Sequence, residues 1–410
     1  MPTEPTYLIV GASLAGAKAA ETLRSEGFDG RVIMLGRETE RPYERPPLSK
    51  GYLLGKEDKS VIYVHEEAWY ADHDIDLRLG VTVTSVDPAG RTVTTADGET
   101  VGYDRLLLTT GASPRQLNIP GAEREGVLYL RTVGDSERLA AAFQGGGRVV
   151  TVGAGWIGLE ATAAAREAGC EVTVVEPELT ALYRALGPEL GEVFADLHRE
   201  HGVQFLFGES VSELRGPGAG GPVGEVITSS GVALPADKVV VGIGVVPNTG
   251  LAADAGLDVG NGVVTDAALR TSDPNIYAAG DLASSYHPLL GRRVRVEHWA
   301  NALSSGPAAA KAMLGQDVTY DPVPYFFSDQ YDLGMETAGL PEPGHYDQVL
   351  YRGDRAAREF IAFWLASGAV VAGMNVNVWD VNDDIQALIR SRKQVDPALL
   401  TDPDVPLGDL

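Results

Sequence analysis

Two glycine-rich segments have the residue types and the spacing needed to bind the pyrophosphate of a dinucleotide. Gly11–Gly16 (Gly-Ala-Ser-Leu-Ala-Gly) follows the apolar run Tyr7–Val10, and Gly153–Gly158 (Gly-Ala-Gly-Trp-Ile-Gly) follows Val149–Val152. A glycine turn between a strand and a helix brings backbone N–H groups and the positive end of the helix dipole against a phosphate. One such turn is weak evidence because many only cap a helix, but a pair in one chain predicts two dinucleotides.

The acidic residue after the second segment predicts which dinucleotide binds there. Glu176 ends the next expected strand, where a carboxylate accepts hydrogen bonds from both ribose hydroxyls of an adenosine. A 2'-phosphate would be repelled by Glu176 and Glu178, at roughly 4 kcal/mol for one pair at an intermediate dielectric. We therefore expect NADH rather than NADPH. Arg184 either weakens this selection or serves the pyrophosphate, and an exposed strand-end glutamate is the alternative for Glu176.

The first segment and a later Gly-Asp pair predict FAD. Ser13 stands in place of the middle glycine of the first segment, which is the smallest departure from the pattern. Asn275–Asp281 is expected to be a strand that ends in Gly280 and Asp281. A carboxylate there can bind a polyhydroxyl chain, which the ribityl group of FAD has and NAD lacks. A strand-ending turn is the alternative for this pair.

Composition excludes several classes of function. The chain has 33 basic and 57 acidic residues, a net charge of -24, which disfavours nucleic acid and anionic membranes as partners. Cys170 is the only cysteine, so no intramolecular disulfide or cysteine-rich metal site is expected. His198 and His201 lie three apart on an expected helix without a third ligand, and we interpret them as a solvated face. With no signal peptide or membrane span recognised, the cytoplasm is the expected location.

The order of the expected elements predicts an α/β chain with an inserted domain. Each glycine segment opens a βαβ unit: a helix over Ala15–Glu26 and a strand over Val32–Leu35 in the first, a helix over Ile157–Ala168 and a strand over Val172–Val175 in the second. We expect a discontinuous first domain (1–112 and 246–324), an inserted domain (113–245) and a C-terminal α+β domain (325–410). The C-terminal elements expected are strands at Phe360–Trp364 and Val370–Ala372 and a helix at Ile385–Arg390. Gly216–Pro222 is expected to be a hairpin loop.

Several longer segments, in order along the whole chain, resemble one family. They are Arg41–Lys50 (with Pro-Pro-Leu-Ser-Lys as the most specific part), Leu108–Gly111, Gly242–Asn248, the strand ending in Asp281, and Phe327–Tyr331. The chain resembles the oxygenase-coupled NADH-dependent ferredoxin reductases, the family of putidaredoxin reductase, rubredoxin reductase and apoptosis-inducing factor. The resemblance implies two Rossmann-like dinucleotide-binding domains in a glutathione-reductase-like architecture, with a C-terminal α+β domain over the flavin.

The resemblance also implies the residues of two cofactor sites, and with the glycine segments these make the predicted site. Phe327 stands where the family often has tryptophan beside the flavin. The predicted residues for non-covalent FAD are Gly11, Ser13, Leu14, Ala15, Gly16, Arg37, Arg45, Lys50, Val83, Thr110, Arg131, Gly280, Asp281, Trp299 and Phe327, and those for NADH are Gly153, Gly155, Ile157, Gly158, Glu160, Glu176, Arg184 and Gly244.

The family pairing of Lys50 with Glu160 is the predicted catalytic pair, and the resemblance is its only basis. Hydride transfer from nicotinamide C4 to flavin N5 requires stacked rings, and an ion pair beside N5 would hold that geometry. Its expected role is positioning rather than proton transfer, with an ordinary inter-domain salt bridge as the alternative. A helix expected over Asn301–Leu314 could direct its N-terminus at the reduced flavin, an effect of roughly 0.3 to 2 kcal/mol.

The absence of a second cysteine narrows the route by which electrons leave. Disulfide reductases of this architecture need a redox cysteine pair, and peroxidase-type relatives need one cysteine near residue 42, but Pro42–Pro47 contains none. The resemblance therefore implies an FAD-dependent NADH:ferredoxin oxidoreductase whose iron-sulfur ferredoxin supplies an oxygenase. The alternatives are a rubredoxin reductase and an NADH-responsive signalling flavoprotein like apoptosis-inducing factor. Two basic clusters, Arg292/Arg293/Arg295 in an expected loop and Arg390/Arg392/Lys393, are candidates for docking an acidic ferredoxin.

Overall fold

The computed structural model describes residues 4–410, and contacts between residues divide them into two compact units. Unit 1 contains the chain up to Glu44, Lys59–Ser113 and Val246–Pro324. Unit 2 contains Arg45–Asp58, Pro114–Val245 and Tyr325–Leu410. Each unit is described separately below.

A five-stranded parallel sheet forms the centre of unit 1. Its strand order is β20-β7-β1-β2-β3, so the chain runs outward from β1 on one side and then continues from β7 on the other. The carboxyl ends of β1 and β7 therefore flank the point where the strand order reverses, which is where open α/β sheets bind ligands. The strands are β1 (Thr6–Val10), β2 (Arg31–Gly36), β3 (Ile75–Leu79), β7 (Arg105–Leu108) and β20 (Ile276–Ala278).

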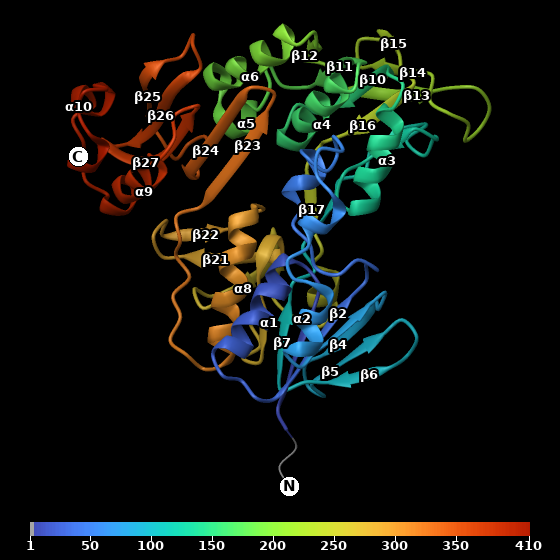
Figure 1. The fold of residues 1–410 in the computed structure, drawn as a ribbon, viewed down its shortest axis with the longest axis vertical. Coiled ribbons are helices and arrows are strands. Elements are labelled where there is room, and N and C mark those ends of the chain that lie inside the picture. The colour runs from blue at the N-terminus through green and yellow to red at the C-terminus, as the bar shows by residue number, and fades with distance from the viewer. Residues whose placement is uncertain (1–3) are drawn as a thin grey trace. The chain divides into compact units, whose positions relative to one another are not determined.

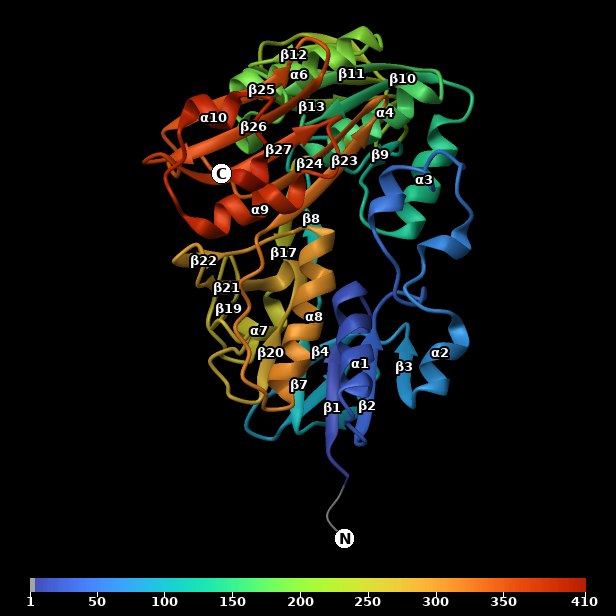
Figure 2. The same cartoon turned by 60° about the vertical axis from the view of Figure 1, so that its left-hand side comes forward.

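Two helices lie together against this sheet. The blue helix α1 (Leu14–Ser25) and the orange helix α8 (Trp299–Met313) run side by side in Figures 1 and 2. Their backbones approach so closely that a Cβ on Gly306 would lie 2.2 Å from the carbonyl oxygen of Ala15. Small residues at this crossing thus fix the first turn of α1 against α8.

Shorter elements complete unit 1. A three-stranded antiparallel sheet, a four-stranded sheet with both parallel and antiparallel pairs, and short helices accompany the parallel sheet. They are β4 (Val83–Asp87), β5 (Thr92–Thr95), β6 (Thr100–Gly102), β18 (Val259–Gly260), β19 (Gly262–Thr265), β21 (Ala283–His287), β22 (Arg292–Val294), α2 (Glu67–Asp72), α7 (Gly250–Asp254), η2 (Lys59–Ile62) and η3 (Gly280–Leu282). The strands β8 (Ala112–Pro114) and β17 (Val245–Pro247) lie where the chain passes between the units.

A second parallel sheet, in the order β12-β11-β10-β16-β9, repeats the same design in unit 2. Its order again reverses beside the strand that precedes a glycine segment, here β10. The elements are β9 (Val127–Leu128), β10 (Gly147–Val152), β11 (Cys170–Glu176), β12 (Gln204–Phe207), β16 (Lys238–Val241), α3 (Val133–Phe143), α4 (Trp156–Glu167), α5 (Tyr183–Leu186) and α6 (Pro188–Glu200). A small antiparallel sheet of β13 (Val211–Arg215), β14 (Glu225–Thr228) and β15 (Ala233–Pro235) follows.

The C-terminal part of unit 2 is an antiparallel sheet in the order β23-β24-β27-β26-β25. It runs from orange to red in Figure 2, with α9 and α10 beside it. Its core contains Trp364, Phe360 and Phe363, each fully buried on β26. The elements are β23 (Tyr325–Gln330), β24 (Leu333–Gly339), β25 (Gln348–Asp354), β26 (Glu359–Ala366), β27 (Ala369–Val376), α9 (Asn382–Ser391), α10 (Pro397–Thr401) and η4 (Leu407–Asp409). The segment Arg45–Asp58 adds the short helix η1 (Pro46–Ser49) to unit 2.

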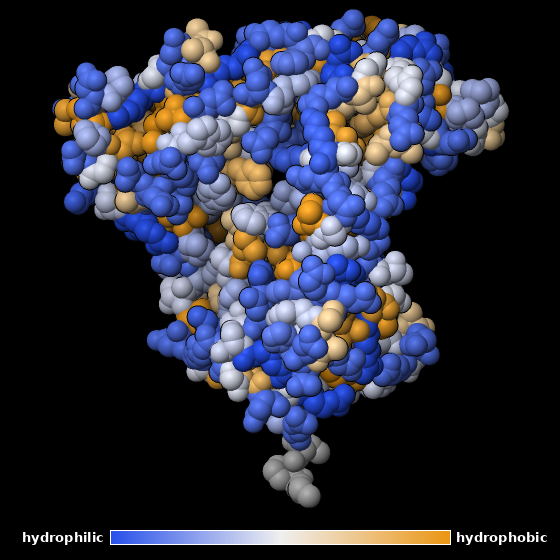
Figure 3. Space-filling view, in the orientation of Figure 1, coloured by the Kyte–Doolittle hydropathy of each residue, from blue (hydrophilic) through white to orange (hydrophobic). Residues whose placement is uncertain are grey.

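The predicted fold class, two Rossmann-like sheets plus a C-terminal α+β region, is confirmed. The predicted hairpin loop Gly216–Pro222 joins the antiparallel strands β13 and β14. The face in Figure 3 is mainly hydrophilic, with hydrophobic residues in separate small patches. Within residues 4–410, no helix has the length and apolar character needed to cross a membrane.

One predicted loop is instead a strand. Arg292 and Arg293 lie in β22, which pairs with β21. The Arg293 guanidinium donates to the carbonyl oxygens of Thr265 and Ser284, and Arg295, only 8% exposed, pairs with Glu297. Both guanidinium groups bond to partners within unit 1, so they are less suited to docking an acidic ferredoxin than the sequence indicated.

Candidate active site

The first glycine turn is shaped by its contact with the neighbouring strand. Gly11 has a φ of +118°, and a Cβ there would lie 2.3 Å from the carbonyl oxygen of Thr109. Ser13 is the N-cap of α1: its hydroxyl accepts from the Gly16 N–H (3.4 Å) and donates to the Thr109 carbonyl (3.2 Å). The serine side chain is therefore tied into the turn, which leaves the other N–H groups of the first helical turn for a phosphate.

The remaining predicted residues of unit 1 come from the carboxyl edge of its sheet or from close beside it. Thr110 follows β7, and its hydroxyl donates to the Asn248 carbonyl at 3.2 Å. Gly280 and Asp281 follow β20, and the Gly280 N–H donates to Ser305 of α8 at 2.9 Å. Trp299 begins α8, with its indole N–H donating to Glu44 at 3.2 Å. Exposed Arg37 follows β2, and half-buried Val83 begins β4.

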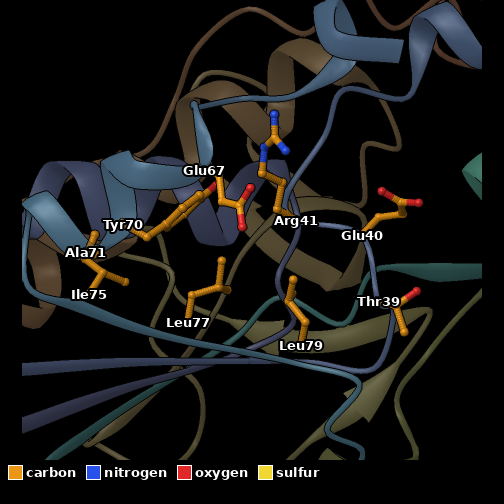
Figure 4. Close-up of a pocket in the computed structure, with 9 residues that line it drawn as sticks. All are labelled: Thr39, Glu40, Arg41, Glu67, Tyr70, Ala71, Ile75, Leu77 and Leu79. Carbon is orange, nitrogen blue, oxygen red and sulfur yellow. The ribbon is translucent and has the colours of Figure 1, made fainter.

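A pocket of about 370 Å³ lies between the segment that follows β2, the helix α2 and the strand β3 (Figure 4). Leu77 and Leu79 of β3 form an apolar part of its wall, and Tyr70 comes from α2. The Tyr70 hydroxyl is buried and has no hydrogen-bond partner among the described residues. The lining is Thr39, Glu40, Arg41, Glu67, Tyr70, Ala71, Ile75, Leu77 and Leu79, which includes none of the predicted cofactor residues.

Two glycines of the second turn lie where neighbouring atoms leave no room for a side chain, while the third has room around it. A Cβ on Gly153 would lie 2.5 Å from the Gly242 carbonyl oxygen, and one on Gly158 would lie 2.3 Å from the Gly153 carbonyl oxygen. Gly155, the N-cap of α4, has only one neighbour within 4 Å, at 3.9 Å, and an ordinary φ of -79°. The missing side chain of Gly155 leaves open space beside the helix N-terminus, which fits the approach of a pyrophosphate.

Glu176, at the end of the neighbouring strand β11, is hydrogen-bonded to the backbone of this turn. Its carboxylate accepts from the Ala154 N–H at 2.6 Å and from the Glu178 N–H at 2.9 Å. These bonds fix the carboxylate at the end of β11, beside the glycine turn. Arg184 pairs with Glu178 at 2.7 Å, while Ile157 is 46% exposed on α4 and Gly244 follows β16 with a φ of +93°. The fixed carboxylate and the open Gly155 together fit an adenosine ribose and its pyrophosphate.

The predicted catalytic pair is formed within unit 2. The Lys50 ammonium lies 2.8 Å from Oε1 of Glu160, and the glutamate side chain is only 3% exposed. Ser49 donates to Oε2 of Glu160 at 2.5 Å, and Ser328 of β23 donates to Oε1 at 2.7 Å. Because a buried carboxylate is costly unless its lone pairs are satisfied, these three donors offset the cost of burying the Glu160 side chain.

The other predicted flavin residues of unit 2 are Phe327, which lies near Lys50, and Arg45 and Arg131, which contact each other. The Lys50 ammonium lies 5.6 Å from the centre of the Phe327 ring, within cation–π range. Arg45, at the start of η1, donates to the carbonyl of Arg131, and the Arg131 N–H is held by Asp135 of α3. The predicted flavin residues are thus divided between the two units, with Arg45, Lys50, Arg131 and Phe327 in unit 2.

The prediction of a solvated histidine face on α6 is wrong. His198 is fully buried, and its polar neighbours are Gln330, the last residue of β23 in the C-terminal sheet, and Tyr331, which follows it. Burial lowers the pKa of His198 to about 4, so the ring is neutral at ordinary pH. His201 is half-buried and stacks on the Tyr331 ring at 3.7 Å.

Sequence reasoning did not find the roles of Ser49 and Ser328, which bond to Glu160, or of Gln330 and His198, which are linked to it through Ser328. Three of them lie in segments that carried the family resemblance, so their segments were recognised without their roles. A usable signal is the alternation in β23, where Phe326, Ser328 and Gln330 share one face of the strand.

Comparison with protein families identifies the class. Residues 5–306 match the family described as pyridine nucleotide-disulphide oxidoreductase, and residues 325–410 match the reductase C-terminal family. The chain belongs to the pyridine nucleotide-disulphide oxidoreductases and is an oxidoreductase. Membership implies FAD and a nicotinamide dinucleotide as cofactors, which the two glycine turns fit.

Relatives confirm the resemblance to oxygenase-coupled ferredoxin reductases. The anthranilate 1,2-dioxygenase system ferredoxin–NAD(+) reductase component of Burkholderia cepacia is 40% identical over 408 residues, 99% of both chains. The crystal structure of the covalent putidaredoxin reductase–putidaredoxin complex matches with a TM-score of 0.95 and 36% identity, covering 99% of this chain and 98% of that one. The ferredoxin reductase for the CYP199A2 system from Rhodopseudomonas palustris matches with a TM-score of 0.94 and 37% identity over 98% of this chain and 99% of that one.

Two glycine-to-alanine variants test whether a glycine of the second turn is needed for ligand binding or for packing of the protein. We expect Gly155→Ala to leave thermal stability unchanged but to weaken NADH binding about tenfold or more, because the new methyl group occupies the space for the phosphates. Gly158→Ala, whose methyl group meets a carbonyl oxygen, should lower stability by roughly 1–3 kcal/mol. Calorimetric titration and thermal unfolding measure both effects, and unchanged NADH binding in Gly155→Ala would contradict the assignment.

Proposed function

We propose that the protein is an FAD-dependent NADH:ferredoxin oxidoreductase that supplies single electrons to a small iron-sulfur ferredoxin, and through it to an oxygenase. The full-length match to ferredoxin reductases of oxygenase systems, at about 40% identity, is the observation that carries this proposal. The likeness to the reductase in the putidaredoxin reductase–putidaredoxin complex supports a ferredoxin as partner. The cytoplasm is the proposed location.

The presence of two parallel sheets, each with its own glycine turn, supports binding of a different cofactor at each sheet. We propose that residues 1–112 and 246–324 bind FAD without a covalent bond, that residues 113–245 bind NADH, and that residues 325–410 form the third domain. FAD held by the first domain would supply an acceptor for the hydride of NADH, which leaves NAD⁺, and its reoxidation would release two electrons one at a time together with one proton. The glycine turn at Gly11–Gly16 holds the FAD pyrophosphate, and Asp281 is proposed to bind the ribityl hydroxyls.

The Lys50–Glu160 pair is proposed to position the reacting rings. The ammonium of Lys50 is held at a fixed place by a carboxylate that cannot move, because Glu160 is bonded by donors from η1 and β23 as well. A fixed positive charge beside the ring that gains a hydride favours the reduced form and orients both rings for transfer. Neither residue needs to transfer a proton in this role.

The route out of the flavin supports single-electron transfer. Cys170, the only cysteine, is fully buried at the start of β11 and donates to the Phe143 carbonyl at 3.7 Å. Burial raises the pKa of its thiol, which disfavours the reactive thiolate. A dithiol therefore cannot carry the electrons, and an external one-electron carrier fits instead.

Steady-state reduction of cytochrome c by NADH, with and without a purified two-iron two-sulfur ferredoxin, tests the proposed partner. We expect the ferredoxin to raise the rate by at least about tenfold, because a docked ferredoxin would take single electrons from the reduced flavin and pass them on to cytochrome c. Flavin reduction by NADH without acceleration by the ferredoxin would contradict the proposal. Acceleration by rubredoxin alone would indicate a rubredoxin reductase, and slow turnover with every carrier would favour a signalling flavoprotein.

Glu176→Ala tests the choice of NADH. Loss of the carboxylate removes charge-assisted hydrogen bonds to the adenosine ribose, each contributing about 1.5–3 kcal/mol, so the KM for NADH should rise roughly 10- to 100-fold with kcat little changed. Glu171→Ala, at an exposed position on the same strand, is the matched control and should leave KM unchanged. An unaltered KM in Glu176→Ala would remove this residue from the site.

A further inference from the structure

A continuous series of buried hydrogen bonds connects Glu160 to the helix α6. Ser328 donates to Glu160 at 2.7 Å, and Gln330 donates through its Nε2 to the Ser328 hydroxyl at 3.1 Å. Oε1 of Gln330 lies 2.8 Å from Nε2 of His198, whose Nδ1 lies 3.4 Å from the Tyr331 hydroxyl. Glu160 is 3% exposed, Gln330 is 1% exposed, and both Ser328 and His198 are 0% exposed.

Three separate segments of the chain build this series. Glu160 lies in the second turn of α4, His198 lies near the end of α6, and Ser328 and Gln330 lie two residues apart on β23. Figures 1 and 2 show the orange strand β23 beside the green helix α4. Because alternate residues of a strand face the same side, β23 can place both polar groups between the two helices.

The charge on Glu160 sets the direction of every bond in the series. An ionised carboxylate only accepts, so the Ser328 hydroxyl must donate to it, and its oxygen is then left to accept. Gln330 must therefore direct its NH₂ group to Ser328 and its carbonyl oxygen to His198. Nε2 of His198 must then carry the proton, which leaves Nδ1 to accept from Tyr331. The reverse orientation would put a hydroxyl lone pair against the carboxylate, which is unfavourable in a buried place.

We propose that Ser328, Gln330 and His198 form a one-directional hydrogen-bond relay that holds the Glu160 carboxylate in the orientation that pairs with Lys50. His198 is then a positioning residue for hydride transfer, acting through two side chains on a group it does not touch. This inference rests on the proposed function for its kinetic effect, but the direction of the bonds does not depend on that function.

The environment of His198 supports a neutral donor. Its pKa is lowered to about 4, chiefly by burial, with the bond to Gln330 opposing and His201 adding to the decrease. The other rings near it are those of Tyr331, in an edge contact at 5.1 Å, and Phe205 at 6.2 Å. A neutral imidazole with its proton on Nε2 is the form that the relay requires.

The tautomer can be measured directly. In ¹⁵N-histidine-labelled protein, which has seven histidines, the His198 signals are assigned by their loss in His198→Gln. At pH 7 we expect a neutral ring protonated on Nε2. A ring protonated on Nδ1, or a cationic ring, overturns the proposal. This readout requires neither NADH nor turnover.

The kinetic test compares two substitutions at the same position. His198→Leu removes the donor, and His198→Gln places an amide N–H near the position of Nε2. Single-turnover reduction of the flavin by saturating NADH should slow about tenfold in His198→Leu, since a displacement of 1 Å in a catalytic site costs up to about 100-fold. His198→Gln should recover the wild-type rate to within about twofold, because it keeps the donor to Gln330. Equal rates in wild type and His198→Leu, or equal slowing in both variants, overturn the relay.

Two controls separate the relay from general loss of stability. Leu197→Ala, at a fully buried apolar position of the same helix, lowers stability without touching the relay and should leave the rate unchanged. The double variant His198→Leu/Ser328→Ala should be no slower than Ser328→Ala alone, because the two residues act on Glu160 in series. Slowing in Leu197→Ala to the level of His198→Leu, or additive losses in the double variant, overturns the proposal. Wild-type protein whose flavin NADH does not reduce would instead refute the proposed function, and the tautomer measurement would still stand.

Discussion

The buried ion pair between Lys50 and Glu160 is the interaction on which the proposed chemistry depends. A carboxylate that is 3% exposed is costly to ionise, and breaking such a pair costs about 3–5 kcal/mol. The structure offsets that cost with three donors from two segments, because Ser49 and Lys50 come from the turn at η1 and Ser328 comes from β23. The C-terminal sheet thus supplies one of the hydrogen bonds that stabilise a buried residue of the second dinucleotide-binding fold.

Each parallel sheet carries a glycine turn, and the two turns differ in whether a side chain is accepted at the middle position. In each, a glycine turn leaves the strand beside which the strand order reverses, and a carbonyl oxygen from the adjacent strand or loop excludes any side chain at the first glycine. The middle position differs: Ser13 fills the space with a hydroxyl that caps α1, while Gly155 leaves it open. A side chain is accepted in the first turn because it bonds back into the turn, and the second turn keeps its full opening for a ligand that must enter and leave.

Features that depend on local sequence could be predicted, and those that depend on distant packing could not. The glycine turns and Glu176 follow from the order of strand, turn and helix, which neighbouring residues encode. Whether His198 faces solvent is decided by β23, a strand more than 100 residues later in the chain, and spacing along α6 carries no information about it. The same holds for Arg293, whose acceptors lie on β19 and β21. The pairing of Lys50 with Glu160 came from family resemblance alone, because no local pattern links η1 to α4.

The most direct test of the account is the rate at which saturating NADH reduces the bound flavin in Glu160→Gln, measured anaerobically in a single turnover. Glutamine preserves the size of the side chain and much of its hydrogen bonding but removes the charge that holds Lys50. The account predicts a fall of roughly 10- to 100-fold in this rate, with flavin content and the Kd for NADH close to wild type. A rate equal to that of the wild type would show that the ion pair does not position the hydride transfer and would contradict the central claim.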